Sequence, residues 1–146
     1  MYRRIVVPLD GSELAESALA HARVIAGCTG AEILLLRVVF EGGLDYYADP
    51  LAASSVQDRM EREAAAYLVQ VAAGLEKDGL KVTTQVGAGS AADGIIDYAD
   101  RMQAELIAMT THGRSGIARW LMGSVADKVA RGANVPVLLI RPGKAG

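Results

Sequence analysis

The strongest constraint on the fold is a regular alternation between short apolar runs and longer stretches with helical periodicity. Most of the apolar runs are almost continuous, which is typical of strands buried on both faces of a parallel sheet. The stretches between them place apolar residues three and four positions apart, as amphipathic helices do. We expect strands at residues 5–9, 33–40, 80–86, 105–110 and 135–140, and helices at about 12–29, 54–77, 90–102 and 124–133.

The order of these elements predicts a doubly wound α/β fold. Strands that alternate with helices form a parallel sheet through right-handed crossovers, with helices on both faces. The run at 80–86 alternates apolar and polar residues, which favours an edge of the sheet. For five strands we expect the order 3-2-1-4-5 within a single domain spanning 1–146. A ligand site is then expected where the order reverses, beyond the carboxyl ends of the first and fourth strands.

The segment 109–127, MTTHGRSGIARWLMGSVAD, follows the fourth predicted strand and has the features of an anion-binding loop. Gly113 and Gly123 permit backbone conformations or close approaches that a Cβ would prevent, although a plain turn would use the same glycines. We expect Ser124 to cap the next helix, whose N–H groups and dipole attract negative charge. Arg114 and Arg119 would supply positive charge to a phosphate.

Composition argues against several other classes of protein. The 146 residues carry 15 Lys and Arg against 17 Asp and Glu, a net charge of −2, which argues against a broad basic surface for nucleic acid. Cys28 is the only cysteine, so neither an internal disulfide nor a cysteine-based zinc site is expected. The first apolar run is too short for a signal peptide and no stretch reaches membrane-spanning length, so we expect a cytoplasmic protein.

Two segments resemble the universal stress protein family, and the likeness extends over nearly the whole chain. They are IVVPLDGSELAESAL at 5–19 and MTTHGRSGIARWLMGSVADKVARGANVPVLLIRP at 109–142. Nucleotide-binding members of the family carry Gly-x2-Gly-x9-Gly-Ser/Thr, and the matching positions here are Thr110, Gly113, Gly123 and Ser124. Thr110 departs from the pattern. Because Thr110 directly continues a predicted strand, we expect extended backbone there, and not the positive φ that would strain a β-branched residue.

The resemblance implies a nucleotide site in the crevice between the first and fourth strands. ATP, alone or with Mg²⁺, is the expected ligand, and AMP and cyclic AMP rank behind it. Asp10 also suits this role by its chemistry, because a carboxylate accepts hydrogen bonds from a ribose or an amino group. The resemblance implies that the nucleoside contacts Asp10 and the backbone of Pro8, Leu9 and Val38, and that Met109 and Thr110 line the same wall of the site. It implies further that the phosphates contact Gly113, Arg114, Gly123, Ser124 and Val125.

Catalytic motifs are weak in comparison. His112 has no adjacent Cys, Asp or Glu, so packing is favoured over proton transfer or metal binding. A G-x-G-x-x-A stretch begins at Gly87, but it follows a predicted edge strand, and the next strand ends in Thr110 instead of an acidic residue. A turn is therefore favoured over a dinucleotide fingerprint. No Walker motif is present. We expect nucleotide binding with a stress-response or signalling output, and at most weak ATP hydrolysis.

Two alternative functions stay open at this point. One is a stress protein that binds no nucleotide and acts through protein contacts, with Thr110 as the lost glycine. The other is a slow ATP hydrolase or transferase, for which Asp10 and His112 are the candidate groups.

The last predicted strand indicates a homodimer. The run from Val135 to Ile140 is very apolar for an edge strand, and pairing of two copies along it would cover that edge. The family resemblance implies the same dimer. Elsewhere, Tyr46 and Tyr47 lie in a predicted acidic loop. Two interpretations stay open for them, stacking on a base or a partner, and folding of the rings onto the protein surface.

Overall fold

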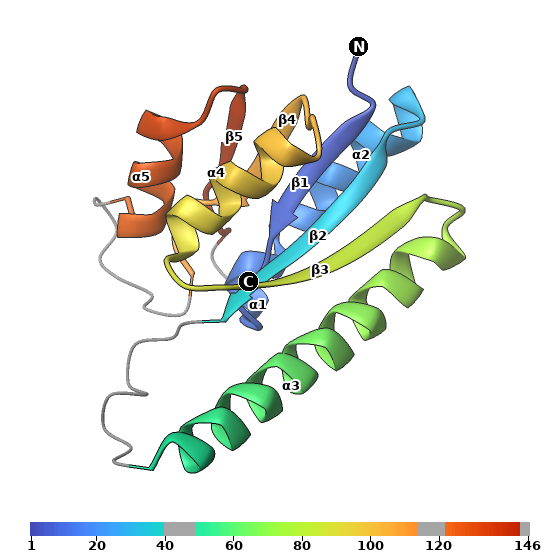
Figure 1. Cartoon of the computed structure of the whole chain (residues 1–146). Coiled ribbons are helices and arrows are strands. Elements are labelled where there is room, and N and C mark those ends of the chain that lie inside the picture. Colours follow the sequence, from blue (N-terminus) through green and yellow to red (C-terminus); the bar gives the residue numbers. More distant parts are fainter. Residues whose placement is uncertain (40–48, 114–121, 144–146) are drawn as a thin grey trace.

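The computed structural model describes residues 1–39, 49–113 and 122–143. Its parallel strands lie in the order β3-β2-β1-β4-β5, which confirms the predicted topology and the edge position of the third strand (Figure 1). None of the described helices is long and apolar enough to cross a membrane. The elements are β1 (Arg4–Pro8), α1 (Glu13–Glu16), α2 (Ala18–Thr29), β2 (Glu32–Val39), α3 (Pro50–Lys77), β3 (Val82–Ala88), α4 (Ala91–Arg101), β4 (Leu106–Thr110), α5 (Ser124–Gly132) and β5 (Val137–Ile140).

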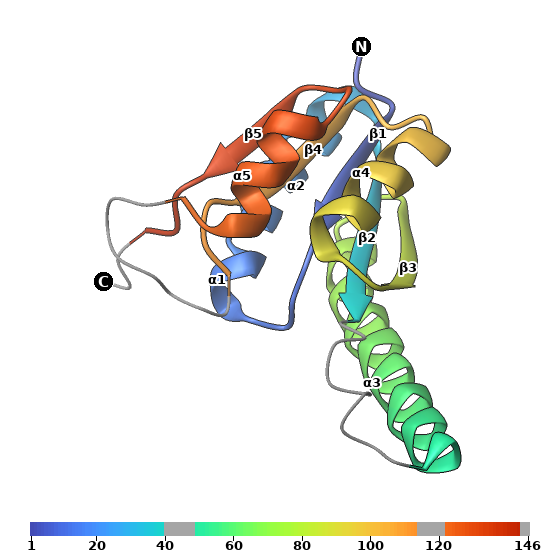
Figure 2. The same ribbon diagram turned by 60° about the vertical axis from the view of Figure 1, so that its left-hand side comes forward.

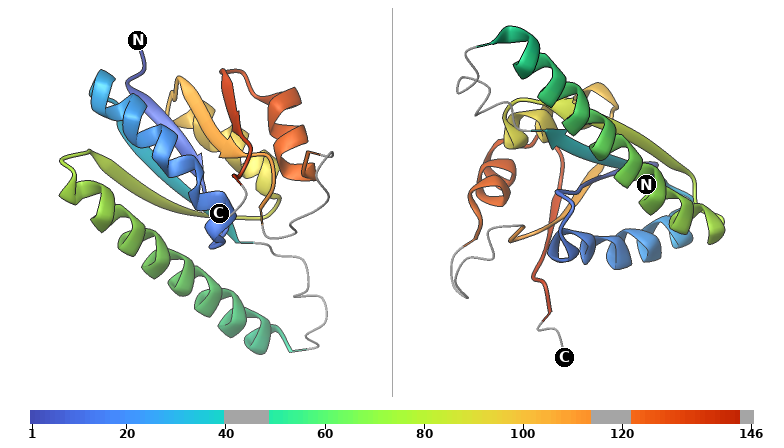
Figure 3. Two further views of the ribbon diagram at one scale, coloured as in Figure 1. Left: turned by 180° about the vertical axis from the view of Figure 1, so that it is seen from behind. Right: turned by 90° about the horizontal axis from the view of Figure 1, so that it is seen from below.

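Helices cover both faces of the sheet, α4 and α5 on one side and α2 and α3 on the other (Figures 1 and 3). Side chains of β1 therefore alternate between two cores, as a doubly covered strand requires. Val6 packs in the cluster with α4 and α5, whereas Ile5 and Val7 pack in the cluster with α2 and α3. All three are fully buried, which explains the unbroken apolar run in the sequence.

The first predicted helix is two helices, which Ser17 separates as the C-cap residue of α1 and the N-cap residue of α2. Ser12 caps α1 as expected, and its hydroxyl accepts from the Ala15 N–H at 3.1 Å. The Ser17 hydroxyl then donates to the Leu14 carbonyl. Such a bond from a serine to the preceding turn competes with the helical ladder.

Helix α3 begins one turn earlier than its apolar periodicity indicated. Its N-cap is Asp49, whose Oδ1 accepts from the Leu51 N–H at 3.0 Å, and Pro50 occupies the first turn, where proline is favoured. The N-terminal half of α3 runs past the end of the sheet (Figure 2). Capping residues, and not the apolar stripe, therefore decide where this helix starts.

The glycine-rich stretch after β3 is a turn, as expected. Gly87 belongs to β3, and Gly89 adopts a left-handed φ of 101° while its N–H donates to the Val39 carbonyl at 3.0 Å. Ser90 is the N-cap residue of α4, but its side chain makes no capping bond.

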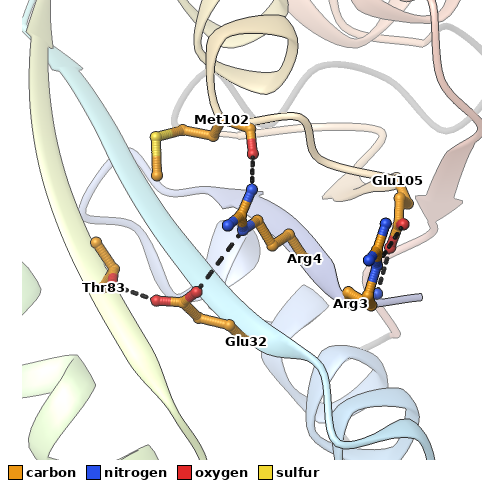
Figure 4. Close-up of polar contacts among 6 residues, drawn as sticks. All are labelled: Arg3, Arg4, Glu32, Thr83, Met102 and Glu105. Atoms are coloured by element: carbon orange, nitrogen blue, oxygen red, sulfur yellow. Dashed lines mark hydrogen bonds and ion pairs between the residues drawn. The ribbon is translucent and has the colours of Figure 1, made fainter.

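Polar contacts connect the amino ends of the strands, which lie opposite the carboxyl ends where the site is predicted (Figure 4). The acceptor carboxylates lie on β2 and just before β4, and the donors lie on or beside β1 and β3. The N–H bonds from Arg3 hold the pKa of Glu105 below its usual range. The contacts join Arg4 to the Met102 carbonyl (2.8 Å) and to Glu32 (4.0 Å), Thr83 to Glu32 (2.5 Å), and Arg3 to Glu105.

Tyr98 is a polar anomaly in the core between the sheet and α4. Its side chain is 2% exposed, and its hydroxyl has no hydrogen-bond partner within the described parts of the chain. The Arg101 guanidinium lies 5.5 Å from the ring centroid. Burial raises the pKa of Tyr98 above the ordinary value of 10.0.

We predict that Tyr98→Phe leaves the protein as stable at neutral pH, or more stable by about 1 kcal/mol, because an unpaired buried hydroxyl is removed. Since the raised folded pKa favours the neutral phenol, the stability linked to Tyr98 is present below pH 10.0 and is lost as the pH rises above that value. The loss of stability at alkaline pH is therefore expected to be shallower in the variant. Urea denaturation at neutral pH and above pH 10.0 measures both effects. A large destabilisation at neutral pH would show that the hydroxyl is hydrogen-bonded.

Candidate functional site

A cavity of about 280 Å³ lies at the carboxyl ends of β1 and β4, where the strand order reverses. This is the position that the topology predicts for a ligand site. Ten of the eleven predicted site residues line it, and the eleventh, Arg114, lies outside the described residues, as do Arg119, Tyr46 and Tyr47. The ten lining residues are Pro8, Leu9, Asp10, Val38, Met109, Thr110, Gly113, Gly123, Ser124 and Val125.

Asp10 stands at the end of β1 in a rigid turn. Its Oδ1 accepts from both the N–H of Ser12 (2.9 Å) and the Ser12 hydroxyl (2.5 Å). Because the same hydroxyl accepts from the Ala15 N–H, the carboxylate, the turn and the start of α1 form one unit. The turn itself depends on Gly11, whose φ of 85° is one that other residues rarely adopt.

Gly113 and Gly123 are present because the backbone approaches its neighbours closely, and neither has a positive φ. A Cβ on Gly113 would lie 2.3 Å from Oδ2 of Asp10, so the β4 loop presses against the β1 turn. A Cβ on Gly123 would lie 2.9 Å from the Thr111 carbonyl oxygen, to which the Gly123 N–H donates at 2.7 Å. Of the two roles expected for these glycines, the structure supports close approach.

Thr110 has the extended backbone that its place in the sequence predicts. It is the last residue of β4, pairs with Ile140 of β5 and is 6% exposed. Its hydroxyl donates to the His112 carbonyl at 2.7 Å, which ties the end of the strand to the loop. His112 Nδ1 lies 3.0 Å from the Thr111 hydroxyl, and His112 itself is not among the residues that line the cavity.

Ser124 does not cap α5, contrary to our prediction. Gly123 is the N-cap, because its extended backbone (φ −59°, ψ 152°) places it outside the helix while its carbonyl accepts from the Asp127 N–H at 2.9 Å. Ser124 therefore falls one position too late and becomes the first helical residue. Among the described residues no side chain caps α5, and its first residues line the cavity, so this N-terminus is suited to an anionic group.

The sequence did not predict six residues of the cavity lining, and three of these lie outside the segments 5–19 and 109–142. Ala91 and Ile95 are contributed by α4, and Leu36 by β2. Only the packing of α4 against β2 could reveal them, because their residue types carry no chemical signal. Ala15 belongs to α1, while Thr111 and Ala126 neighbour predicted residues.

The chemistry of the cavity suits binding. Most of its lining is apolar, and Asp10 is the one titratable side chain among the described residues that line it. In the ranges 1–39, 49–113 and 122–143, no group of three His, Cys, Asp or Glu side chains gathers in a way that could hold a metal ion. An apolar slot with a few convergent polar groups is typical of a small-molecule site.

Comparisons with known proteins agree with the fold and its sheet order. The model of the universal stress protein family matches residues 1–141. Universal stress protein MJ0531 of Methanocaldococcus jannaschii is 32% identical over 144 residues, which are 99% of this chain and 85% of that protein. The solved structure of protein MJ0577 from the same organism has a TM-score of 0.90 at 28% identity, and the match covers 99% of both chains.

A further solved structure, a universal stress protein in complex with cAMP, has a TM-score of 0.74 at 26% identity and covers 97% of this chain and 99% of its own. The family match over almost the whole chain, together with the shared fold, leads to one conclusion. The chain belongs to the universal stress protein family.

Proposed function

We propose that this protein binds a nucleotide, ATP first, in the cavity between β1 and β4, and acts in the cytoplasm in stress response or signalling. The observation that carries the proposal is the convergence of ten predicted residues, from four separate stretches of sequence, on one cavity. The related structure in complex with cAMP supports an adenine nucleotide as the class of ligand.

The lining residues fit such a ligand. The apolar walls from Leu36, Val38 and Ile95 suit a base, and the start of α5 at the cavity suits phosphate oxygens. Asp10 would accept from ribose hydroxyls. A Mg²⁺ ion that accompanied the phosphates would find in Asp10 the one carboxylate among the described lining residues, and would supply charge neutralisation.

The same lining supports a binding protein with at most weak hydrolysis. Activation of a water for attack on a phosphate needs a positioned base. Asp10 already accepts two hydrogen bonds at Oδ1 from its own turn, and its Oδ2 lies against Gly113. We therefore propose that the output is a ligand-dependent signal and not a product.

We predict that ATP, ADP or AMP is released when the purified protein is denatured, and that the emptied protein binds ATP in calorimetry. Gly113→Ala and Gly123→Ala should each weaken binding at least about tenfold, because a new Cβ would displace Asp10 or the Thr111 carbonyl. Gly27→Ala, in α2 with no atom near its Cβ position, is the matched control and should bind like the parent protein.

Two results would overturn the proposal. No released nucleotide and no binding of ATP, ADP, AMP or cyclic AMP would leave action through protein contacts as the function. Multiple-turnover hydrolysis that His112→Ala abolishes would instead favour the enzyme.

Thr110 can be tested separately from the glycines. We predict that Thr110→Val, which keeps the shape but removes the hydroxyl that donates to the His112 carbonyl, weakens ATP binding about fivefold, in the range of one hydrogen bond. Thr110→Ser keeps the hydroxyl and should bind within about twofold of the parent protein. Equal affinities for all three proteins in calorimetry would show that this bond does not organise the loop.

We further propose that two copies pair along β5. The carbonyls of Pro136 and Ile140 accept from the N–H groups of Ile107 in β4 and of Thr111 just after it. In a parallel ladder the alternate residues Val137 and Leu139 therefore direct their backbone groups to the other edge of β5. Pairing with a second copy would satisfy those groups and cover the apolar edge.

We predict that the parent protein sediments as a dimer at micromolar concentration. Leu139→Pro removes an N–H from the free edge without removing a bond to β4, and should shift the protein to the monomer. Sedimentation velocity measures the mass, and circular dichroism checks that the variant stays folded. A monomeric parent protein would refute this interface.

A further inference from the structure

Arg37 is a charged residue inside the second buried strand, and no role in the cavity accounts for it. Its neighbours Leu36 and Val38 line the cavity, while Arg37 itself does not. Because side chains alternate along a strand, Arg37 lies on the opposite face of the sheet, toward α3. A half-buried charge in such a strand requires a structural or functional reason.

The Arg37 guanidinium contacts the turn that carries Asp10. A Cβ built on Gly11 would lie 3.1 Å from Nη1, 3.2 Å from Nη2 and 3.3 Å from Cζ of Arg37. The three nearly equal distances place the flat guanidinium over the position that a Gly11 side chain would occupy. The left-handed φ requires glycine at this position, and the absent side chain leaves room for Arg37 beside the turn.

Tyr67 of α3 supports the guanidinium from the helix layer. Cζ of Arg37 lies 5.0 Å from the centroid of the Tyr67 ring, within the range of a cation–π interaction. The Tyr67 hydroxyl donates to Oε1 of Glu16 in α1 at 2.9 Å. Burial, and then this bond to Glu16, raise the pKa of Tyr67, so the phenol remains a neutral donor. Strand β2, helix α3 and helix α1 are thereby joined beneath the turn.

We propose that Arg37 is a positioning residue for the ligand site. By packing on Gly11 and stacking on Tyr67, it holds the Asp10–Gly11–Ser12 turn, so that the Asp10 carboxylate is fixed at the cavity before a ligand arrives. The effect on affinity rests on the proposed nucleotide function, whereas the ordering of the turn does not. In this proposal, Arg37 and Tyr67 support the ligand site from the face of the sheet that α2 and α3 cover.

Two kinds of measurement test this role. Hydrogen exchange of the ligand-free protein reports on the turn through the amides of Ser12 and Ala15, whose N–H groups bond to Asp10 and to the Ser12 hydroxyl. Calorimetry with ATP reports on the site. We predict that Arg37→Met lowers protection of these two amides about tenfold and weakens ATP binding about tenfold, the scale of one lost cation–π contact. Amides in the centre of β1 should be protected to the same degree in Arg37→Met as in the control variant Arg23→Met.

The control is Arg23→Met, which removes an exposed ion pair of 2.9 Å with Asp78 at the far end of α3. It should leave the two amides and the ATP affinity unchanged. Tyr67→Leu removes the stacking partner and should reproduce the effect of Arg37→Met, whereas Tyr67→Phe keeps the ring and should have the smaller effect. Tyr67→Leu also replaces Arg37→Met if that variant fails to fold.

The outcomes separate this role from the proposed function. Loss of protection at the turn alone, with weaker ATP binding, supports both. Loss at the turn in a protein whose parent form binds no nucleotide supports the positioning of the turn and overturns the nucleotide proposal. Unchanged protection at the turn, or a uniform loss across the sheet, overturns the role of Arg37.

Discussion

The structure depends on β1 being enclosed on all sides. It pairs with β2 along one edge and with β4 along the other, and helices cover both of its faces. Such a strand must be apolar throughout, and its polar groups can appear only at its ends. At the amino end these are Arg3 and Arg4, and at the carboxyl end Asp10. The polar groups of β1 are thereby confined to its ends.

The two ends use their polar groups differently. At the amino end, Arg4 and Glu32 bond to neighbouring elements and close the sheet (Figure 4). At the carboxyl end, Gly11 and Gly113 remove side-chain volume, so that backbone and the Asp10 carboxylate meet around an open space. Stability at one end and a cavity at the other are consistent with the separation of core and site in doubly wound sheets.

The cavity and the opposite helix layer are linked in this protein. Arg37 and Tyr67 lie behind the Asp10 turn, on the face that α2 and α3 cover, while the cavity opens on the side of α4 and α5. The turn is held internally by the bonds from Ser12 to the Asp10 carboxylate, and Arg37 and Tyr67 lie where they can hold that bonded unit in place at the cavity.

The sequence by itself determined the order of the elements and the sheet topology, because apolar periodicity and the ends of parallel strands are local or topological properties. Residue chemistry pointed to Asp10, Gly113, Gly123 and Ser124, and the family resemblance implied the other six predicted residues that line the cavity. The break between α1 and α2 at Ser17 is local, but a bond from Ser17 to Leu14 is not readable from apolar periodicity. Tertiary structure alone decided the rest. The N-cap at Gly123 in place of Ser124 and the contribution of Ile95 depend on which atoms meet across separate elements. The same holds for Arg37, which in the sequence is only an interruption of an apolar run. Arg37 lies beside Gly11 because β2 brings it beneath a turn that is 26 positions earlier in the chain. No local pattern in the sequence predicts that two residues so far apart meet.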